Sequence, residues 1–216
     1  MHKVYFIAGL GANKRAFGFL DLSWCEPVFI DWIPAAKNES LREYALRLRL
    51  CIPEVNPFVV GVSFGGMLTT EMAKADPGVK AIIISSNKIS KEFPAYLRMW
   101  KYMPVYKWVS PGTIKYTGLL TKNLIGPQGK LQKETFSKIV EETDPVFTAW
   151  AVDAILHWRN TDVPQNLVYI HGSGDRLLPI RYVRPNYIVK GGKHVMIMDK
   201  AEEISALLKT LVLEWK

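Results

Sequence analysis

Hydrophobic residues recur along the chain in short runs of strand length, separated by longer segments with helical spacing. The runs rich in β-branched and aromatic residues cover 3–8, 27–31, 58–62, 79–85, 166–171 and 186–189. Their nearly continuous apolarity is typical of strands buried on both faces, as in a parallel sheet covered by helices. Between them, the Ser-Leu-Arg-Glu sequence at 40–43 has the capping-box pattern and predicts a helix to about Leu50, and residues 199–202 begin the final helix in the same way. This alternation predicts a doubly wound α/β sheet.

One long segment interrupts the alternation, because no strand is predicted between residues 88 and 160. Prolines at 94, 104, 111, 127 and 145 begin or end helical pieces there. The clearest piece begins at Asp144-Pro145 and places Phe147, Trp150, Ala151, Ala154, Ile155 and Trp158 on one stripe. We interpret residues 88–160 as a helical lid inserted after the fourth strand, with 1–87 and 161–216 as the core of a single domain.

The composition is that of an ordinary globular domain. Of the 216 residues, 49% are hydrophobic and 22% charged, which excludes collagen-like, disordered and disulfide-scaffold proteins. No apolar run approaches the ~20 residues of a membrane span, and the apolar stretch near the N-terminus is too short for a signal peptide. The only two cysteines, Cys25 and Cys51, are too few for a disulfide framework. We therefore expect a cytoplasmic protein with no stable membrane insertion.

The charge is less ordinary, since 28 basic residues against 20 acidic ones leave a formal net charge of +8. Nucleic acid, an acidic membrane or an anionic substrate could each account for this excess. Residues 88–160 hold 11 basic and six acidic residues, so a net charge of +5 falls in the predicted lid. No nucleic-acid-binding module accompanies it, and we predict no nucleic-acid partner. Two interpretations stay open: a solvated lid face, and a lid that steers anionic acyl substrates toward the active site.

The third predicted strand runs into a G-x-S-x-G sequence, Gly61-Val62-Ser63-Phe64-Gly65, which leads into a helix pattern that ends near Ala75. A nucleophilic serine on a strained strand-to-helix turn needs glycines on both sides, because side chains there would collide with the flanking backbone. The helix behind it offers free N–H groups to a developing oxyanion. The pattern alone is weak, but its position between a strand and a helix makes Ser63 a candidate nucleophile.

A serine nucleophile needs a base and an acid that orients the base. Of the four histidines, His194 follows the last predicted strand through a Gly-Gly turn, at the carboxyl edge of the sheet where ligands bind in such folds. Asp175 follows the preceding strand through Gly-Ser-Gly and lies at the same edge. The remaining histidines and the rival acids are His2, His157, His171, Asp144, Asp153 and Asp162. The resulting order along the chain is Ser63, Asp175, His194.

On these segments the chain resembles the α/β-hydrolase superfamily over nearly its full length. Residues 7–11 resemble the oxyanion loop, 61–66 the nucleophile elbow, 171–179 the acid loop and 191–194 the histidine loop. The resemblance implies that Ser63 is the nucleophile, His194 the general base and acid, and Asp175 the residue that orients it. It also implies an oxyanion hole formed by the backbone N–H groups of Phe64 and Leu10.

The same resemblance implies a serine hydrolase that cleaves an ester or thioester of a small-molecule acyl substrate, with no metal or organic cofactor. The chain departs from the family in two respects. Because it begins directly at the strand before the oxyanion loop, the first two strands typical of the fold are missing and a minimal, mostly parallel six-stranded sheet is expected. The family's usual His-Gly is Ala8-Gly9 here, so the match to the family at the Leu10 donor is weaker than at the Phe64 donor.

Several alternatives remain open at this point. Asp31 and Trp32 end the second predicted strand, where a substrate-facing role and a loop-capping role are equally plausible. Trp150 and the other aromatic residues of the predicted lid, Trp100, Tyr102, Tyr106, Trp108, Phe147 and Trp158, suit core packing more than a cofactor site, although some could line an apolar acyl pocket. Two further functions are a non-catalytic protein of this fold that binds a small apolar ligand, and a peripheral binder of anionic surfaces. The sequence does not indicate an oligomeric state.

Overall fold

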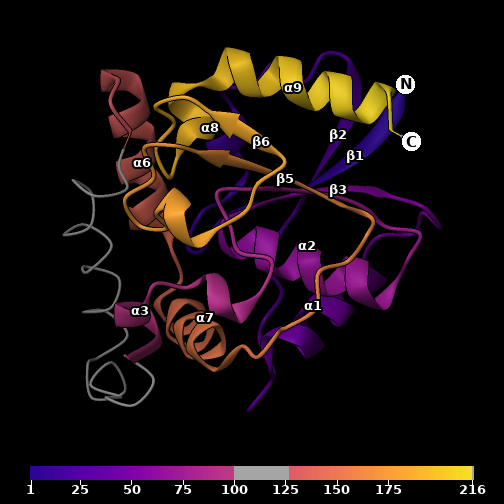
Figure 1. The fold of residues 1–216 in the computed structure, drawn as a ribbon, viewed down its shortest axis with the longest axis vertical. Coiled ribbons are helices and arrows are strands. Elements are labelled where there is room, and N and C mark those ends of the chain that lie inside the picture. The colour runs from indigo at the N-terminus through magenta and orange to yellow at the C-terminus, as the bar shows by residue number, and fades with distance from the viewer. Residues whose placement is uncertain (100–126, 216) are drawn as a thin grey trace.

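The computed structural model describes residues 1–99 and 127–215, which form a parallel sheet covered by helices on both faces (Figure 1). The six strands are β1 (His2–Ile7), β2 (Cys25–Ile30), β3 (Phe58–Val62), β4 (Lys80–Ile84), β5 (Leu167–Gly172) and β6 (Tyr187–Val189). Their order across the sheet is β2-β1-β3-β4-β5-β6, and every neighbouring pair is parallel. The predicted six-stranded sheet is confirmed.

The helices divide between the two faces of the sheet. In the described part of the chain they are α1 (Leu41–Leu50), α2 (Phe64–Ala75), α3 (Ala95–Met99), α6 (Lys130–Glu142), α7 (Pro145–His157), α8 (Met196–Asp199) and α9 (Ala201–Leu213), with short 3₁₀ turns η1 (Lys14–Phe17), η2 (Ser90–Glu92) and η5 (Ile180–Tyr182). Figure 1 shows α9 over one face and α1, α2 and α7 toward the other. No helix of the described residues is long and apolar enough to cross a membrane.

Alternate strand residues supply two separate hydrophobic cores. In β1, Tyr5 and Ile7 pack with residues of α1, α2 and α7, whereas Val4 and Phe6 pack with residues of η1, α8 and α9. Successive residues of a strand point to opposite faces of the sheet. Because helices cover both faces, all four side chains are buried. This two-sided burial explains why the strands are nearly continuous apolar runs.

The local signals at two helix starts had different outcomes. Ser40 caps α1 in a capping box, in which its hydroxyl accepts from the Glu43 N–H and the Glu43 side chain accepts from the Ser40 N–H. The corresponding prediction at Asp199 is wrong. Asp199 is the last residue of α8, and its carboxylate accepts from the backbone N–H of Gln128, so α9 begins at Ala201 without a side-chain cap.

The predicted lid segment, where it is described (88–99 and 127–160), contains η2, α3, α6 and α7 and no strand. Asp144 caps α7 and Pro145 is its first residue, as expected. The α7 stripe packs into the core shared with α1 and α2, and the Trp158 Nε1–H donates to the buried Glu71 carboxylate at 2.7 Å. This helix is therefore part of the core of the domain. The predicted aromatic residues Trp100, Tyr102, Tyr106 and Trp108 lie outside the described residues.

Candidate active site

Ser63 occupies a strained turn between β3 and α2. Its backbone has φ 52° and ψ −116°, a conformation that is costly for a residue with a side chain and that is typical of a nucleophile elbow. The turn is tight, since a β-carbon at Gly65 would lie 2.3 Å from the carbonyl oxygen of Ala8. A β-carbon at Gly61 would lie 2.3 Å from the carbonyl oxygen of Gly65. Both glycines are therefore required by close contact with backbone atoms, as the G-x-S-x-G pattern predicts.

The structure brings the three predicted residues into one hydrogen-bonded chain. The Ser63 Oγ lies 2.9 Å from the His194 Nε2, and the His194 Nδ1 lies 2.8 Å from the Asp175 Oδ2. Because an ionised carboxylate only accepts hydrogen bonds, the proton of a neutral His194 lies on Nδ1, and Nε2 is free to accept from the serine hydroxyl. Asp175 and His194 are buried, whereas Ser63 is partly exposed. The arrangement can transfer a proton from Ser63 to His194.

The loops after β5 and β6 position the acid and the histidine against each other. The Gly174 N–H donates to the Gly192 carbonyl at 2.9 Å, and the Gly191 N–H donates to the Ser173 hydroxyl at 2.8 Å. A β-carbon at Gly172 would lie 2.1 Å from the Gly192 carbonyl oxygen, so the two loops are in direct backbone contact. Neighbouring parallel strands thus deliver both side chains to the carboxyl edge of the sheet.

Asp175 is held as a carboxylate by several donors. Its Oδ1 accepts from the backbone N–H groups of Leu177 and Leu178, each at 2.9 Å. Burial raises the pKa of this carboxyl, but His194, the Leu178 N–H and His171 all lower it, and the net pKa is below its usual value. Asp175 therefore keeps the negative charge that a protonated His194 would need.

His171 is a further histidine beside Asp175, and sequence reasoning treated it only as the end of a strand. Its Nε2 lies 2.8 Å from the Leu178 carbonyl and 3.7 Å from the Asp175 carboxylate, and its Nδ1 lies 2.8 Å from the Tyr169 hydroxyl. The Leu178 carbonyl can only accept, so the His171 Nε2 carries a proton, and the Tyr169 hydroxyl beside Nδ1 donates to the Ser86 carbonyl. Burial lowers the pKa of His171 and outweighs the raising influence of Asp175. The only sequence signal for this contact is its place four residues before Asp175.

We expect this buried histidine to make folding sensitive to mild acid. With its pKa lowered in the folded state, the unfolded chain binds more protons at pH values below the ordinary histidine value of about 6.5. The free energy of unfolding should therefore fall as the pH is lowered from 7 to 5, a slope measurable by urea denaturation. His171→Gln should reduce the slope. His157→Gln, on the exposed part of α7, is the matched control, and an equal reduction in both variants would contradict the prediction.

The two predicted oxyanion donors belong to segments that adjoin Ser63. Phe64 is the first residue of α2, where backbone N–H groups have no partner within the helix. Leu10 follows Gly9, whose Cα position faces Ser63, since a β-carbon there would lie 3.3 Å from the Ser63 Cβ. The Ser63 carbonyl accepts from the Ser86 hydroxyl at 2.6 Å, a contact that the sequence did not indicate.

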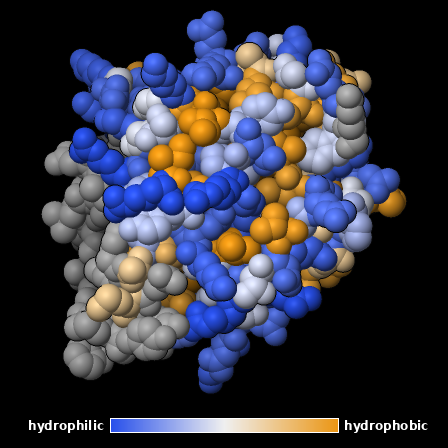
Figure 2. Space-filling model, viewed as in Figure 1, coloured by the Kyte–Doolittle hydropathy of each residue, from blue (hydrophilic) through white to orange (hydrophobic). Residues whose placement is uncertain are grey.

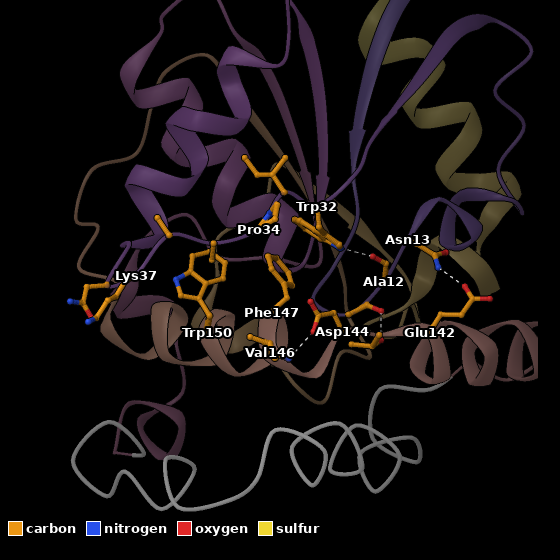
Figure 3. A pocket seen from close by; sticks show the side chains of 16 residues that line it. Ala12, Asn13, Trp32, Pro34, Lys37, Glu142, Asp144, Val146, Phe147 and Trp150 are labelled. Carbon is orange, nitrogen blue, oxygen red and sulfur yellow. Dashed lines mark hydrogen bonds between the residues drawn. The ribbon is translucent and has the colours of Figure 1, made fainter.

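A cavity of about 660 Å³ lies next to the β1–η1 loop (residues 8–13), which contains Leu10 (Figure 3). Trp32 and Trp150 both line it, together with Phe147 of α7, and Trp32 also packs against Phe64 with ring centroids 5.7 Å apart. The structure thus brings two of the three predicted pocket residues to one cavity. Asp31 is exposed and is not part of its lining.

The basic residues gather in two parts of the chain. The described part of 88–160 holds seven basic and six acidic residues, so most of the excess lies outside the described residues. A second basic stretch, 176–193, has five basic residues and no acidic one, and it forms the loops beside Asp175 and His194. Figure 2 shows hydrophilic side chains over these loops. Among the described residues, no cluster of three or more His, Cys, Asp or Glu side chains could hold a metal ion.

Comparisons with known proteins support the fold. No family model and no curated protein matches the sequence. Among solved structures, a carboxylesterase from Nitrososphaera gargenis is similar with a TM-score of 0.75 at 15% identity, over 99% of this chain and 90% of that one. An esterase from Exiguobacterium antarcticum has a TM-score of 0.74 at 14% identity, over 99% and 92%. A bromoperoxidase from Bacillus anthracis has a TM-score of 0.68 at 15% identity, over 98% and 92%. The chain has the α/β-hydrolase fold, which these proteins share.

Proposed function

We propose that this chain, with its α/β-hydrolase fold, is a serine hydrolase that cleaves a carboxylic ester or thioester through an acyl-enzyme intermediate. The observation that carries the proposal is the hydrogen-bonded chain from Ser63 through His194 to Asp175 on a strained strand-to-helix turn. Similar solved structures include esterases, a carboxylesterase and a putative lipase, which agrees with this reaction class.

In the first half of the reaction, the Ser63 Oγ attacks the acyl carbon while His194 Nε2 takes the hydroxyl proton. The carbonyl oxygen becomes an oxyanion, stabilised by the backbone N–H groups of Phe64 and Leu10. Asp175 accepts a hydrogen bond from the Nδ1–H of the imidazolium and stabilises its positive charge without taking the proton. His194 then gives the proton from Nε2 to the departing alkoxide or thiolate, the bond to the leaving group breaks, and the acyl group stays on Ser63.

In the second half, water takes the place of the alcohol or thiol. His194 removes a proton from the water, and the resulting hydroxide attacks the acyl carbon of the Ser63 ester. The oxyanion forms again in the same place and collapses, and the proton returns from His194 to the Ser63 oxygen as the carboxylic acid departs. The cycle requires no redox partner, because no electrons are gained or lost.

The substrate in this proposal is a small molecule with an apolar portion. The cavity beside the β1–η1 loop has Trp32, Phe147 and Trp150 in its walls, as expected of a pocket for apolar groups. Lys37, Glu142 and Asp144 also line it, so that its margin is polar (Figure 3).

The test is covalent labelling followed by a substrate panel. A fluorophosphonate probe should label the wild-type chain on Ser63 and should not label Ser63→Ala. p-Nitrophenyl esters of increasing chain length, assayed beside acyl-coenzyme A thioesters, then give kcat/KM for each class. Absence of labelling and of turnover in the folded wild type would overturn the proposal in favour of a non-catalytic protein that binds a small apolar ligand.

A further inference from the structure

The β1–η1 loop (residues 8–13) is a tight turn supported on both sides. The Ala12 N–H donates to the Gly9 carbonyl at 2.9 Å, and Gly11, the third residue of this turn, has φ +70°. A positive φ at that position is the requirement of a type II turn, which glycine meets without strain. Gly9 packs on Ser63 at one end of the turn. At the other end a β-carbon on Gly11 would lie 2.9 Å from the Thr143 side chain.

Two side chains hold consecutive carbonyl groups of this loop. The Thr143 Oγ1 lies 2.6 Å from the Gly11 carbonyl oxygen and 2.9 Å from the Ile139 carbonyl oxygen. The hydroxyl has one hydrogen, and the shorter contact is the one to the loop. The Trp32 Nε1–H donates to the Ala12 carbonyl at 2.8 Å, a hydrogen bond that is drawn in Figure 3.

These two supports come from distant parts of the chain. Thr143 lies at the corner between α6 and α7, and Trp32 follows β2. The α6–α7 corner has a second attachment to the loop, because Glu142 accepts from Asn13 Nδ2 at 2.9 Å and pairs with Arg15 at 3.1 Å. That second attachment is exposed and contributes little by itself. The part-buried hydrogen bonds of Thr143 and Trp32 are the ones that can fix the loop.

We propose that Thr143 and Trp32 are positioning residues that set the orientation of the Leu10 N–H toward the oxyanion. The proposal rests on the proposed function, since it assigns a role in stabilising the tetrahedral intermediate. A turn can rotate its peptide planes when its carbonyl groups are not held, and rotation would turn the donor away from the oxyanion. The α6–α7 corner is thereby linked to the chemistry through one hydroxyl, although it contributes no group to the triad.

The hydrogen bonds of Thr143 and Trp32 also connect the cavity to the β1–η1 loop. Gly11, Ala12, Trp32 and Thr143 all line the 660 Å³ cavity, so a ligand in it would touch both supports and the loop they hold. Binding of the apolar part of a substrate there would reinforce the loop in the orientation that stabilises the transition state. Part of the free energy of binding the apolar group then stabilises the transition state, so that it raises kcat more than it lowers KM.

The experiment compares two variants that each remove one donor: Thr143→Val keeps the shape of the side chain, and Trp32→Phe keeps an aromatic ring. Thr143→Val and Trp32→Phe are assayed with p-nitrophenyl butyrate, and the Ki of a trifluoromethyl ketone, which forms a tetrahedral adduct on Ser63, is measured beside kcat and KM. Each variant should lower kcat about tenfold and raise the Ki by a similar factor, because a displaced oxyanion donor costs transition-state stabilisation. Thr143→Val, which preserves the volume of the cavity wall, should change KM little. Thr143→Ser, which keeps the hydroxyl, should restore kcat.

Matched controls separate positioning from stability. Thr148→Val makes the same substitution in α7, where the hydroxyl donates to the Asp144 carbonyl. Trp24→Phe removes an indole N–H that donates to the Asp21 carbonyl, at the amino end of β2. Both should keep kcat within about twofold of the wild type, an expectation based on their lack of contact with the loop.

The outcomes distinguish this inference from the proposed function. If the wild type is labelled and active, two results would contradict the positioning role and leave the proposed hydrolase function intact. One is that Thr143→Val and Trp32→Phe match their controls in kcat and Ki, and the other is that Thr143→Ser is as impaired as Thr143→Val. If the wild type is neither labelled nor active, both fall together. If Thr143→Val does not fold, Trp32→Phe decides the matter by the same two measurements.

Discussion

Ser63→Ala is expected to lower esterase turnover by about 10⁴- to 10⁶-fold, the range typical of the loss of a triad nucleophile. Without the Oγ there is no acyl-enzyme, and His194 and the oxyanion donors can only assist direct attack by water. The fold should survive, because the Ser63 hydroxyl bonds to His194 alone while the backbone of the turn is held by its carbonyl and by the flanking glycines. The measurement is kcat on a p-nitrophenyl ester, with circular dichroism to check folding.

Ser23→Ala is the matched control for this prediction. Ser23 is exposed and precedes β2, at the amino edge of the sheet and away from the carboxyl edge that bears Ser63. The turnover of Ser23→Ala should equal that of the wild type. Turnover of Ser63→Ala within tenfold of the wild type would show that another group performs the attack, and it would remove the central residue of the proposed mechanism.

Asp175→Asn is expected to lower kcat by about 10⁴-fold with little change in the fold, as loss of the orienting carboxylate does in other triads. An asparagine can present its amide NH₂ to His194 Nδ1, which favours the tautomer with the proton on Nε2. That tautomer cannot accept the Ser63 proton. The neutral amide also leaves the imidazolium without a counter-charge 2.8 Å away. The measurement is kcat across pH 5 to 9 for both proteins.

Asp153→Asn is the matched control, since Asp153 also lies near a histidine. Its carboxylate is 3.4 Å from His157 Nδ1, but the two side chains are 41% and 47% exposed on α7. An exposed pair of this kind is worth little, about 0 to 1 kcal/mol, and kcat should not change. If the two substitutions lowered kcat equally, the assignment of Asp175 as the orienting acid would be wrong.

The contacts of the candidate site that the sequence predicts are those encoded by neighbouring residues. Gly61 and Gly65 flank Ser63 in a single turn, so their steric requirement is visible in the sequence, and in the structure a β-carbon at either position would lie 2.3 Å from a backbone oxygen. His194 and Asp175 each follow a strand through glycines, and parallel strands end at one edge. The local sequence pattern and the parallel direction of the strands were therefore sufficient to predict that these residues lie close together, and in the structure they are within hydrogen-bond distance.

The parts that were missed depend on contacts between segments far apart in the chain. His171 was passed over because a strand-end histidine has no local feature that indicates a contact with Asp175. Thr143 lies 132 residues from Gly11, and nothing near either residue indicates their hydrogen bond. The helix cap predicted at Asp199 is wrong for the same reason. The Asp199 carboxylate accepts from the N–H of Gln128, 71 residues away, and not from an N–H of the final helix.

By itself, the sequence determined the six-stranded parallel sheet, the turn at Ser63 and the order along the chain of the three residues of the proposed triad. Burial on both faces requires apolar runs and a strained turn requires glycine, and both requirements act on adjacent residues. Only the tertiary structure decided that α7 belongs to the core, that His171 faces Asp175, and that Thr143 and Trp32 hold the β1–η1 loop. Those contacts arise when the elements pack, because a hydrogen bond between side chain and distant backbone depends on where both segments lie in space and not on either local sequence.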